Sequence, residues 1–178
     1  MQILTSKRLI LRRWKPEDYR PFFLLNSDPQ VMEFLPKVLS QEESNAMILK
    51  IENHFEQRGF GFFACEEQQS QSFIGFVGLS VPQFSCDFTP CVEIGWRIAR
   101  EYWNRGYATE AASEVLLYAR NTLKQKEIVS FTVPNNLPSR RVMEKIGMTY
   151  VKNFYHPALN KDHPLCQHVL YKKHLRDI

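Results

Sequence analysis

Residues 91–123 contain the side chains and the turn best placed to bind an anion and do chemistry beside it, and they read CVEIGWRIAREYWNRGYATEAASEVLLYARNTL. Over 91–98, apolar residues alternate with other residues, which predicts a strand. From Ala108 onward the apolar residues recur with the period of an amphipathic helix. A short turn around Gly106 joins the two segments. The stretch therefore predicts a strand, a tight turn and a helix.

This turn is suited to binding a phosphate group. The first amides of a helix have no partner within it, and the helix dipole places partial positive charge there. Gly106 lets an anion approach the backbone, and Arg100 and Arg105 add formal charge. Neither the Gly-Lys-Ser/Thr of a P-loop nor the three spaced glycines of a dinucleotide fold is present. The pattern favours a phosphate ligand other than a nucleoside triphosphate or NAD; an ordinary helix start without a ligand is the alternative.

The chain contains two motifs: the first comprises EIGW at 93–96 and YWNRGYATEA at 102–111, and the second is NLPSRRVMEKIGM at 136–148. Together they resemble the motifs of the GCN5-related N-acetyltransferases (GNAT), and most closely those of the RimJ/RimL-like branch of ribosomal-protein alanine N-acetyltransferases. The family's loop pattern, Gln/Arg-x-x-Gly-x-Gly/Ala, is matched at Gly106 and Ala108. It is not matched at Trp103, a substitution that the branch commonly carries.

The resemblance implies direct transfer of an acetyl group from acetyl-CoA to a primary amine in a ternary complex. In the branch the acceptor is a protein N-terminal α-amine. A small-molecule amine (a polyamine, amino acid or aminoglycoside) and a non-catalytic acyl-CoA-binding module are the alternatives, since fold and cofactor site do not fix the second substrate. The chemistry needs a free amine, a hydrogen-bond donor to the developing oxyanion and a proton for the leaving thiolate. It needs no metal.

Glu93 and Ser139 are the predicted catalytic residues. A carboxylate within an apolar strand is costly unless it is partnered or hydrated, and many family members carry a glutamate there as general base, acting directly or through water. A structural ion pair is the alternative for Glu93. Many relatives protonate the thiolate with a tyrosine seven residues after the signature Asn136, but this chain has Met143 there. Ser139 is the expected substitute, and a helix N-terminal serine is the alternative.

The resemblance also assigns the cofactor contacts. The backbone of residues 98–100 is expected to pair with the pantetheine arm as an added strand. The turn is expected to hold the pyrophosphate, and the side chain of Asn136 to hydrogen-bond the arm. The complete predicted set is Ile98, Ala99, Arg100, Trp103, Asn104, Arg105, Gly106, Tyr107, Ala108, Thr109, Asn136 and Ser139.

The remaining patterns predict the elements that position these residues. A capping box at Ser40–Glu43 begins a helix over 41–58 that Gly59 ends, and a turn of helix is expected over 28–35. Asn136 caps a short helix that ends before Gly147. Strands are expected over 9–13, 60–65, 73–81, 91–98, 128–133, 149–154 and 168–173. Together these predict a single α/β N-acetyltransferase domain over 1–178, with a mixed, mostly antiparallel, splayed sheet of about six or seven strands flanked by helices.

Composition limits the partners. The 178 residues carry a net charge of +4, which is compatible with CoA but too small to indicate a nucleic-acid partner. No apolar run approaches a membrane span and no signal peptide is recognisable, so we expect a cytoplasmic protein with four reduced cysteines. The histidines His156, His163 and His168 lack metal-site spacing, and acceptor contact is the alternative for one of them. The oligomeric state is not specified, and a homodimer is compatible with the pattern.

Overall fold

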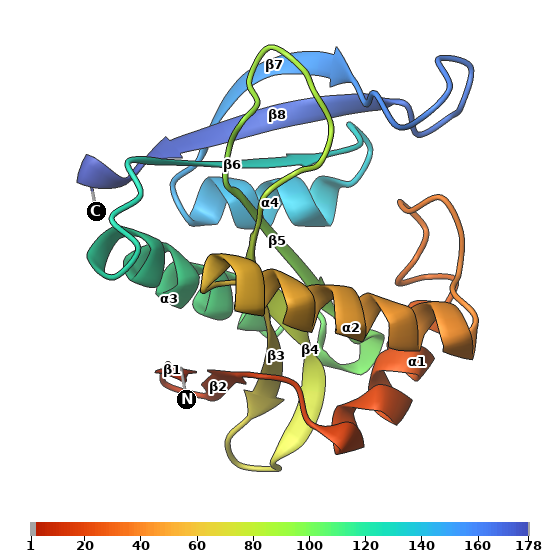
Figure 1. Ribbon diagram of the computed structural model, residues 1–178, viewed down its shortest axis with the longest axis vertical. Coiled ribbons are helices and arrows are strands. Elements are labelled where there is room, and N and C mark those ends of the chain that lie inside the picture. The colour runs from red at the N-terminus through yellow and green to blue at the C-terminus, as the bar shows by residue number, and fades with distance from the viewer. Residues whose placement is uncertain (1–2, 178) are drawn as a thin grey trace.

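The computed structural model describes residues 3–177, which form one mixed sheet with helices on both faces (Figure 1). No helix in this range is both long enough and apolar enough to cross a bilayer. The elements in chain order are β1 (Leu4–Thr5), β2 (Leu9–Arg12), α1 (Tyr19–Ser27), α2 (Gln41–Arg58), β3 (Phe62–Glu67), β4 (Ser72–Ser80), β5 (Glu93–Ile98), α3 (Tyr107–Asn121), β6 (Glu127–Thr132), α4 (Leu137–Lys145), β7 (Thr149–Tyr155) and β8 (Gln167–His174), with 3₁₀ turns at Pro16–Asp18, Arg100–Tyr102 and Leu175–Asp177.

The sheet opens between β5 and β6. Its strand order is β1-β2-β3-β4-β5-β6-β8-β7, and only β5 and β6 are parallel. β4 and β5 pair along their length, from Gly75↔Ile98 to Ser80↔Glu93. β5 and β6, in contrast, pair only at Glu93↔Val129 and then diverge (Figure 1). The predicted splay beside the central strand is present, and Glu93 lies at its vertex.

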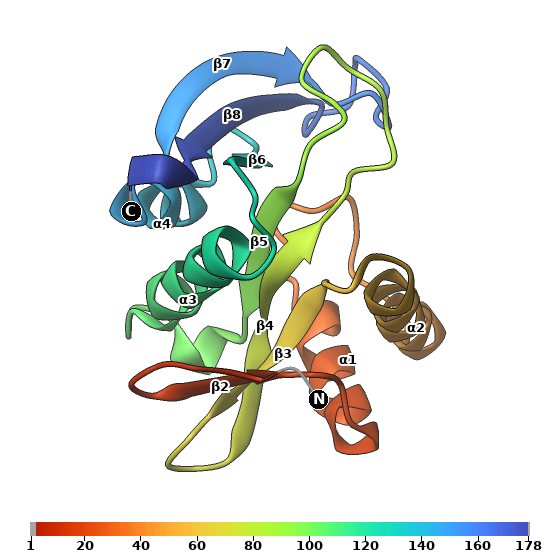
Figure 2. The ribbon, with the colours of Figure 1, turned by 60° about the vertical axis from the view of Figure 1, so that its left-hand side comes forward.

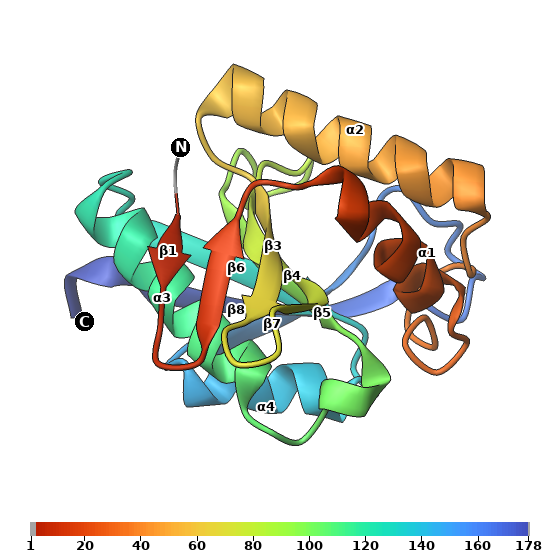
Figure 3. The same cartoon turned by 90° about the horizontal axis from the view of Figure 1, so that it is seen from below.

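The helices divide between the two faces of the sheet. α3 and α4 lie on one face, while α1 and α2 cover the opposite face of β3 to β5 (Figure 2). In the view of Figure 3, α2 lies along one side of β3 and β4, and α3 lies on the other side. The residues of β4 from Ile74 to Leu79 are buried, as its nearly continuous apolar run predicts for a strand covered on both faces.

Two local predictions are confirmed. The Ser40 hydroxyl accepts a hydrogen bond from the Glu43 amide, and the Glu43 carboxylate accepts one from the Ser40 amide, so the capping box begins α2. Gly59 ends it in a left-handed conformation with φ +76°. The glycines of β4 mark close backbone contacts: a Cβ on Gly75 would lie 2.1 Å from the Arg97 carbonyl oxygen, and one on Gly78 would lie 2.2 Å from that of Gly61.

Other expectations differ from the structure in detail. The sheet has eight strands rather than six or seven, because β1 pairs with β2 at Leu4↔Leu11. Over 28–35 the expected turn of helix is present as a single turn, in which the Met32 amide donates to the Asp28 carbonyl four residues earlier, and Pro36 disfavours helical geometry for the preceding residue. Glu93 begins β5 rather than lying in its middle. Strand ends differ by one or two residues, as in β3, which spans Phe62–Glu67.

Candidate active site

The turn before α3 leaves a run of backbone amides without partners. Gly106 is the N-cap of α3 with φ +80°, and Asn104 is also left-handed, with φ +59°. The first backbone hydrogen bond of the helix runs from the Glu110 amide to the Gly106 carbonyl. Within residues 3–177, no amide from Asn104 to Thr109 donates to a protein acceptor. The turn is therefore organised around Gly106 as predicted, although the left-handed Asn104 was not foreseen.

Arg8 is a residue of this site that the sequence analysis did not identify. Its guanidinium stacks on the Tyr107 ring at 4.4 Å, and its Nη2 lies 3.6 Å from where a Cβ on Gly106 would be. Glu110 fixes this position, because its carboxylate accepts from the Arg8 backbone amide and from Arg8 Nε, both at 2.7 Å. These contacts join segments about a hundred residues apart, so local pattern carries no signal for them.

The two arginines predicted at the turn have different environments. Arg100 is turned toward the segment after α1, where Nη1 donates to Gln30 Oε1 at 2.7 Å and Nε lies 3.4 Å from Asp28 Oδ2. Arg105 lies over the Tyr102 ring at 5.6 Å and makes no ion pair with a described residue. Arg105 therefore places positive charge near the amides, whereas the charges of Arg8 and Arg100 are largely compensated by Glu110 and Asp28.

The edge of β5 beyond Glu93 presents backbone groups to the gap. The Ala99 amide donates to the Ile74 carbonyl on β4, so the even-numbered residues of β5 direct their backbone groups toward β6. The Ile94 carbonyl accepts from Ser130 Oγ on β6 at 2.9 Å, which agrees with this alternation. At Ile98 the two strands have separated. Its N–H is directed into the gap, where a ligand could add as a further strand.

The Trp103 side chain bonds a backbone group that was expected to bind the ligand, the Ile98 carbonyl. Its indole Nε1 donates to the Ile98 carbonyl at 2.6 Å, and its side chain is exposed. Of the three residues expected to pair with an extended ligand, Ile98 and Arg100 have amides that donate to no described acceptor, whereas Ala99 uses its own to bond β4. Two of the three amides therefore remain free to pair with a ligand.

Glu93 has no cationic partner among the described residues. Its only hydrogen bond comes from Ser80 Oγ, which donates to Oε2 at 3.3 Å across the β4–β5 pair. Burial raises the pKa of Glu93 to about 8, and the Ser80 hydrogen bond opposes that rise only in part. A structural ion pair, the alternative considered for this residue, is therefore excluded within residues 3–177. Glu93 is a carboxyl group that exchanges its proton near neutral pH.

Asn136 and Ser139 lie at the start of α4. Asn136 Oδ1 accepts from the Ser139 amide at 3.2 Å, and Nδ2 donates to Thr132 Oγ1 at 3.0 Å. Asn136 is therefore a helix cap, as one interpretation held, but its amide retains capacity for a second donor and a second acceptor contact. The Ser139 hydroxyl is half-buried and makes no hydrogen bond to a described residue.

The predicted residues approach the gap from both faces of the sheet. The turn before α3 and the start of α4 lie on one face, where both helices pack (Figure 2). The Glu93 side chain projects from the opposite face, which also carries Arg97 and is covered by α1 and α2, because residues two and four apart on a strand share a face. An extended ligand in the gap would have anion-binding amides at one end and Glu93 at the vertex.

Burial disfavours reactivity at two of the four cysteines. All four cysteines are free, and burial raises the pKa of Cys91 to about 11 and that of Cys65 further, which disfavours a thiolate. His156 and His168 contact one another, with ring centres 5.1 Å apart, whereas His163 accepts from the Leu165 amide in its own loop.

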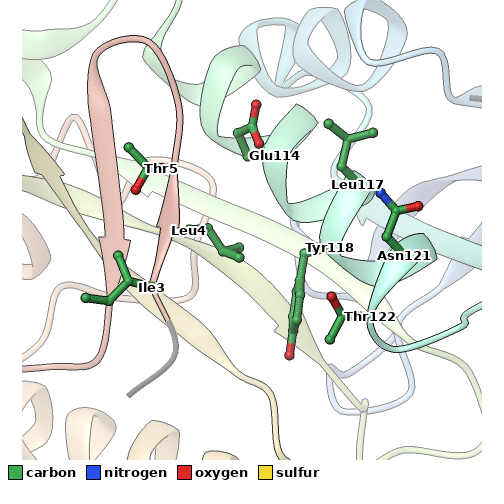
Figure 4. A pocket seen from close by; sticks show the side chains of 8 residues that line it. All are labelled: Ile3, Leu4, Thr5, Glu114, Leu117, Tyr118, Asn121 and Thr122. Carbon is green, nitrogen blue, oxygen red and sulfur yellow. The ribbon is translucent and has the colours of Figure 1, made fainter.

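A depression of about 340 Å³ lies away from this gap, between β1 and α3 (Figure 4). Its lining includes Asn121 and Thr122, at the opposite end of α3 from Gly106. The depression is therefore separate from the amides that would bind an anion.

The comparisons with known proteins agree with this geometry. Residues 8–149 match the acetyltransferase (GNAT) domain family. The chain is 31% identical over 146 residues to the uncharacterised N-acetyltransferase YnaD of Bacillus subtilis, covering 82% of this chain and 81% of YnaD. A GNAT-family acetyltransferase of Bacillus anthracis superposes with a TM-score of 0.82 at 26% identity, covering 98% of this chain and 99% of that one.

Mycobacterium smegmatis RimJ, solved in complex with CoA-disulfide, has the same fold. Its TM-score is 0.81 over 99% of this chain and 89% of its own, at 15% identity. The family match spans most of the chain, and the relatives are similar over nearly their whole length. This protein therefore belongs to the GNAT acetyltransferase family and is an acetyl-CoA-dependent acyltransferase.

Proposed function

We propose that this protein acetylates a primary α-amine, with Glu93 as general base and with acetyl-CoA and acceptor bound together in the gap between β5 and β6. We place it in the RimJ/RimL-like branch, on the two motifs at 93–111 and 136–148, with a protein N-terminus as the acceptor. The observation that carries the proposal is the run of unpaired amides from Asn104 to Thr109 at the open end of the gap, with Glu93 at its vertex.

The cofactor would be held from its pyrophosphate to its thioester. Unpaired amides at a helix N-terminus bind phosphate oxygens through hydrogen bonds and the helix dipole, and Arg105 adds charge. The pantetheine arm would pair with the free edge of β5 and contact Asn136. The proposed cofactor residues are Ile98, Ala99, Arg100, Trp103, Asn104, Arg105, Gly106, Tyr107, Ala108, Thr109, Asn136 and Ser139.

Glu93 would take the proton of the attacking amine, directly or through a water molecule. A carboxylate with a pKa of about 8 is a far stronger base than an ordinary glutamate, and burial is the cause. An α-ammonium has a pKa of about 7.7–8.0, so proton transfer to Glu93 is nearly balanced. A lysine-type ammonium, with a pKa of about 10.4, would be more than two units less acidic. A raised pKa at Glu93 is therefore compatible with deprotonation of an α-ammonium, the more acidic of the two.

Ser139 would assist the departure of the thiolate. Its hydroxyl makes no hydrogen bond within residues 3–177 and lies next to the Asn136 cap on the α4 side of the gap. A serine hydroxyl is a weak acid, so its contribution would be a hydrogen bond to sulfur or a proton relayed from water. The amine would then attack from the Glu93 face while the thiolate leaves toward α4.

Calorimetry and product analysis test this proposal. The purified protein should bind acetyl-CoA, and mass spectrometry should detect an added acetyl group on members of a library of peptides and small amines. Acetylated peptide α-amines would support the proposed acceptor, and acetylation of small amines alone would replace it. Absence of acetyl-CoA binding would overturn the cofactor site.

The amides themselves are tested with two glycine variants. Gly106→Ala introduces a Cβ at a left-handed N-cap, at a cost of about 1–2 kcal/mol, and should weaken acetyl-CoA binding by about tenfold. Gly59→Ala is the matched control, because Gly59 has φ +76°, has open space around it and ends α2. Equal loss of affinity in both variants would assign the effect to stability.

A further inference from the structure

Six aromatic rings form a cluster on the part of the sheet that no helix covers on its Glu93 face. Phe84 and Phe88 come from the loop between β4 and β5, and the other rings come from β6, β7, β8 and the residue after β7. Neighbouring ring centres are 4.6 to 6.4 Å apart. The cluster consists of Phe84, Phe88, Phe131, Phe154, His156 and His168.

The cluster lies on the same sheet face as Glu93. Paired residues on neighbouring strands share a face, so Glu93↔Val129 places Val129 on that face, and Phe131 follows two residues later. The pairs Phe131↔Leu170 and Phe154↔His168 extend the same face across β8 and β7. In Figure 2 the β4–β5 loop lies over this face, opposite α4. Phe131 therefore lies about 7 Å farther than Glu93 along the strand direction.

These rings are separate from the hydrophobic core. None belongs to either core cluster, and each is half-buried rather than buried. The cluster is also uncharged at neutral pH, since burial lowers the pKa of His168 to about 4 and that of His156 below its usual value. The result is an apolar, partly exposed wall beside the vertex of the gap.

The charges on this face do not provide a site for a polycation. Asp87 lies between the two loop phenylalanines and is paired with Lys152 of β7. Glu127 lies on the same face of β6 and is paired with Lys172, with Nζ 3.0 Å from Oε1. Both carboxylates are therefore compensated, and a polyamine or an aminoglycoside would find little net negative charge.

We propose that the six-ring cluster binds an apolar or aromatic side chain attached to the acceptor amine, so that acceptors with a hydrophobic first residue are preferred. The inference rests on the proposed function, because it places the amine at Glu93. A side chain the size of phenylalanine spans the separation between the Glu93 level and Phe131. The shared chemistry is an α-amine with a hydrophobic group, carried either by a peptide or by a free amino-acid derivative.

The wild-type test uses acceptors that differ only in the side chain. Phenylalanine amide, leucine amide, alanine amide and lysine amide have similar α-amines, and spermidine supplies a polycation. We expect kcat/KM for phenylalanine amide to exceed that for alanine amide by about tenfold or more, with spermidine and lysine amide poorest. Peptides beginning with the same four residues distinguish the sources: a larger kcat/KM for peptides assigns a polypeptide acceptor, and a smaller one a free derivative.

Loop variants test the cluster itself. Phe88→Ala should lower kcat/KM for phenylalanine amide by about tenfold through KM, while changing kcat/KM for alanine amide and the affinity for acetyl-CoA by less than about twofold. Phe88→Leu should restore most of the loss, because it retains apolar bulk. Tyr155→Ala is the matched control: Tyr155 is 60% exposed, adjoins Phe154 on β7 and is outside the cluster.

The failures of the two proposals are distinguishable. A protein that binds acetyl-CoA but acetylates phenylalanine amide no faster than alanine amide overturns the hydrophobic side-chain site alone. So does a Phe88→Ala variant that slows every acceptor equally, since the cluster would then only anchor the loop. A protein that does not bind acetyl-CoA overturns the proposed function instead.

Discussion

Arg12 is a buried charged residue of the sheet and Glu93 is a half-buried one, but only Arg12 has partners of opposite charge. Its guanidinium donates to both oxygens of Asp18, at 2.7 and 2.9 Å, and to Glu66 at 2.6 Å. These carboxylates raise the pKa of Arg12 beyond its already high value. Glu93 has a single neutral partner, Ser80, and its pKa moves toward neutrality.

The difference separates a structural charge from a reactive one. A buried ion that is fully paired keeps its charge at every physiological pH and holds elements together, here β2, β3 and the turn before α1. A buried carboxyl without a cation changes protonation near pH 8 and so can exchange a proton with a substrate. Loss of Glu93 should therefore reduce activity, and loss of Arg12 should reduce stability.

The largest expected effect is on turnover. Glu93→Gln should lower kcat by about 10²–10⁴, the usual contribution of a general base, while changing acetyl-CoA affinity less than about twofold. The wild-type kcat should rise with pH through an inflection near 8, as Glu93 loses its proton, and the variant should lack that inflection. Stopped assays from pH 6 to 9 with a saturating α-amine acceptor measure both.

Glu127→Gln is the control for this experiment, because Glu127 is a strand carboxylate on the same face that is paired with Lys172. It should keep the kcat and the inflection of the wild type. If Glu93→Gln retained full turnover across this pH range, Glu93 would have to be removed from the mechanism, and an unpaired buried carboxyl would not mark the base.

The second effect concerns Arg12. Arg12→Met leaves Asp18 without its cation, and Glu66 with only the more distant Lys15, in a site where the Arg12 side chain is 8% exposed, so we expect a loss of about 3–5 kcal/mol in unfolding free energy. Urea unfolding measures it. Arg13→Met is the control, since Arg13 pairs with Glu52 and Glu56 at a more exposed site and should lose about 1 kcal/mol or less. Equal losses would contradict the distinction between the two sites.

Features encoded in a few neighbouring residues were predictable from sequence. Ser40, Glu43 and Gly59 predicted both ends of α2, and Gly106 predicted the turn before α3. β1 was missed because two residues carry no periodicity and are ordered by pairing with β2.

The candidate site was predictable only in part, for the same reason. The motifs identified the turn, Glu93 and Asn136, but the bond from Trp103 to Ile98 became evident only in the fold. Arg8 reaches the turn because the β1–β2 connection packs on α3. The absence of a cation beside Glu93 is a property of every surrounding element, so no local pattern contains it.

The third expected effect is a dependence of the unfolding free energy on pH. The folded pKa of Glu93, about 8, lies above its unfolded value of 4.5, so its contribution to stability is complete below 4.5 and is lost as pH rises toward 8. The unfolding free energy of the wild type relative to Glu93→Gln should therefore fall by on the order of 2 kcal/mol between pH 6 and pH 8. Urea unfolding of both proteins across this range measures the difference. A constant difference would mean that Glu93 is not the isolated buried acid described above.

The smallest effect concerns the one hydrogen bond that Glu93 accepts. Ser80→Ala removes a donor that stabilises the carboxylate, so the pKa of Glu93 should rise further and the inflection in kcat should move up by about half a pH unit. At pH 7 this corresponds to about a threefold lower kcat, with the plateau above the inflection retained. The pH profile of kcat is the measurement.

Ser72→Ala is the matched control, because Ser72 lies at the other end of β4, pairs with Glu67 and does not contact Glu93. It should leave the inflection where it is in the wild type. A Ser80→Ala profile shifted to lower pH would mean that the hydroxyl stabilises the protonated acid instead, since only a donor to the charged form can raise the pKa on removal. The single partner of Glu93 would then favour its neutral form, whereas the partners of Arg12 favour its charged form.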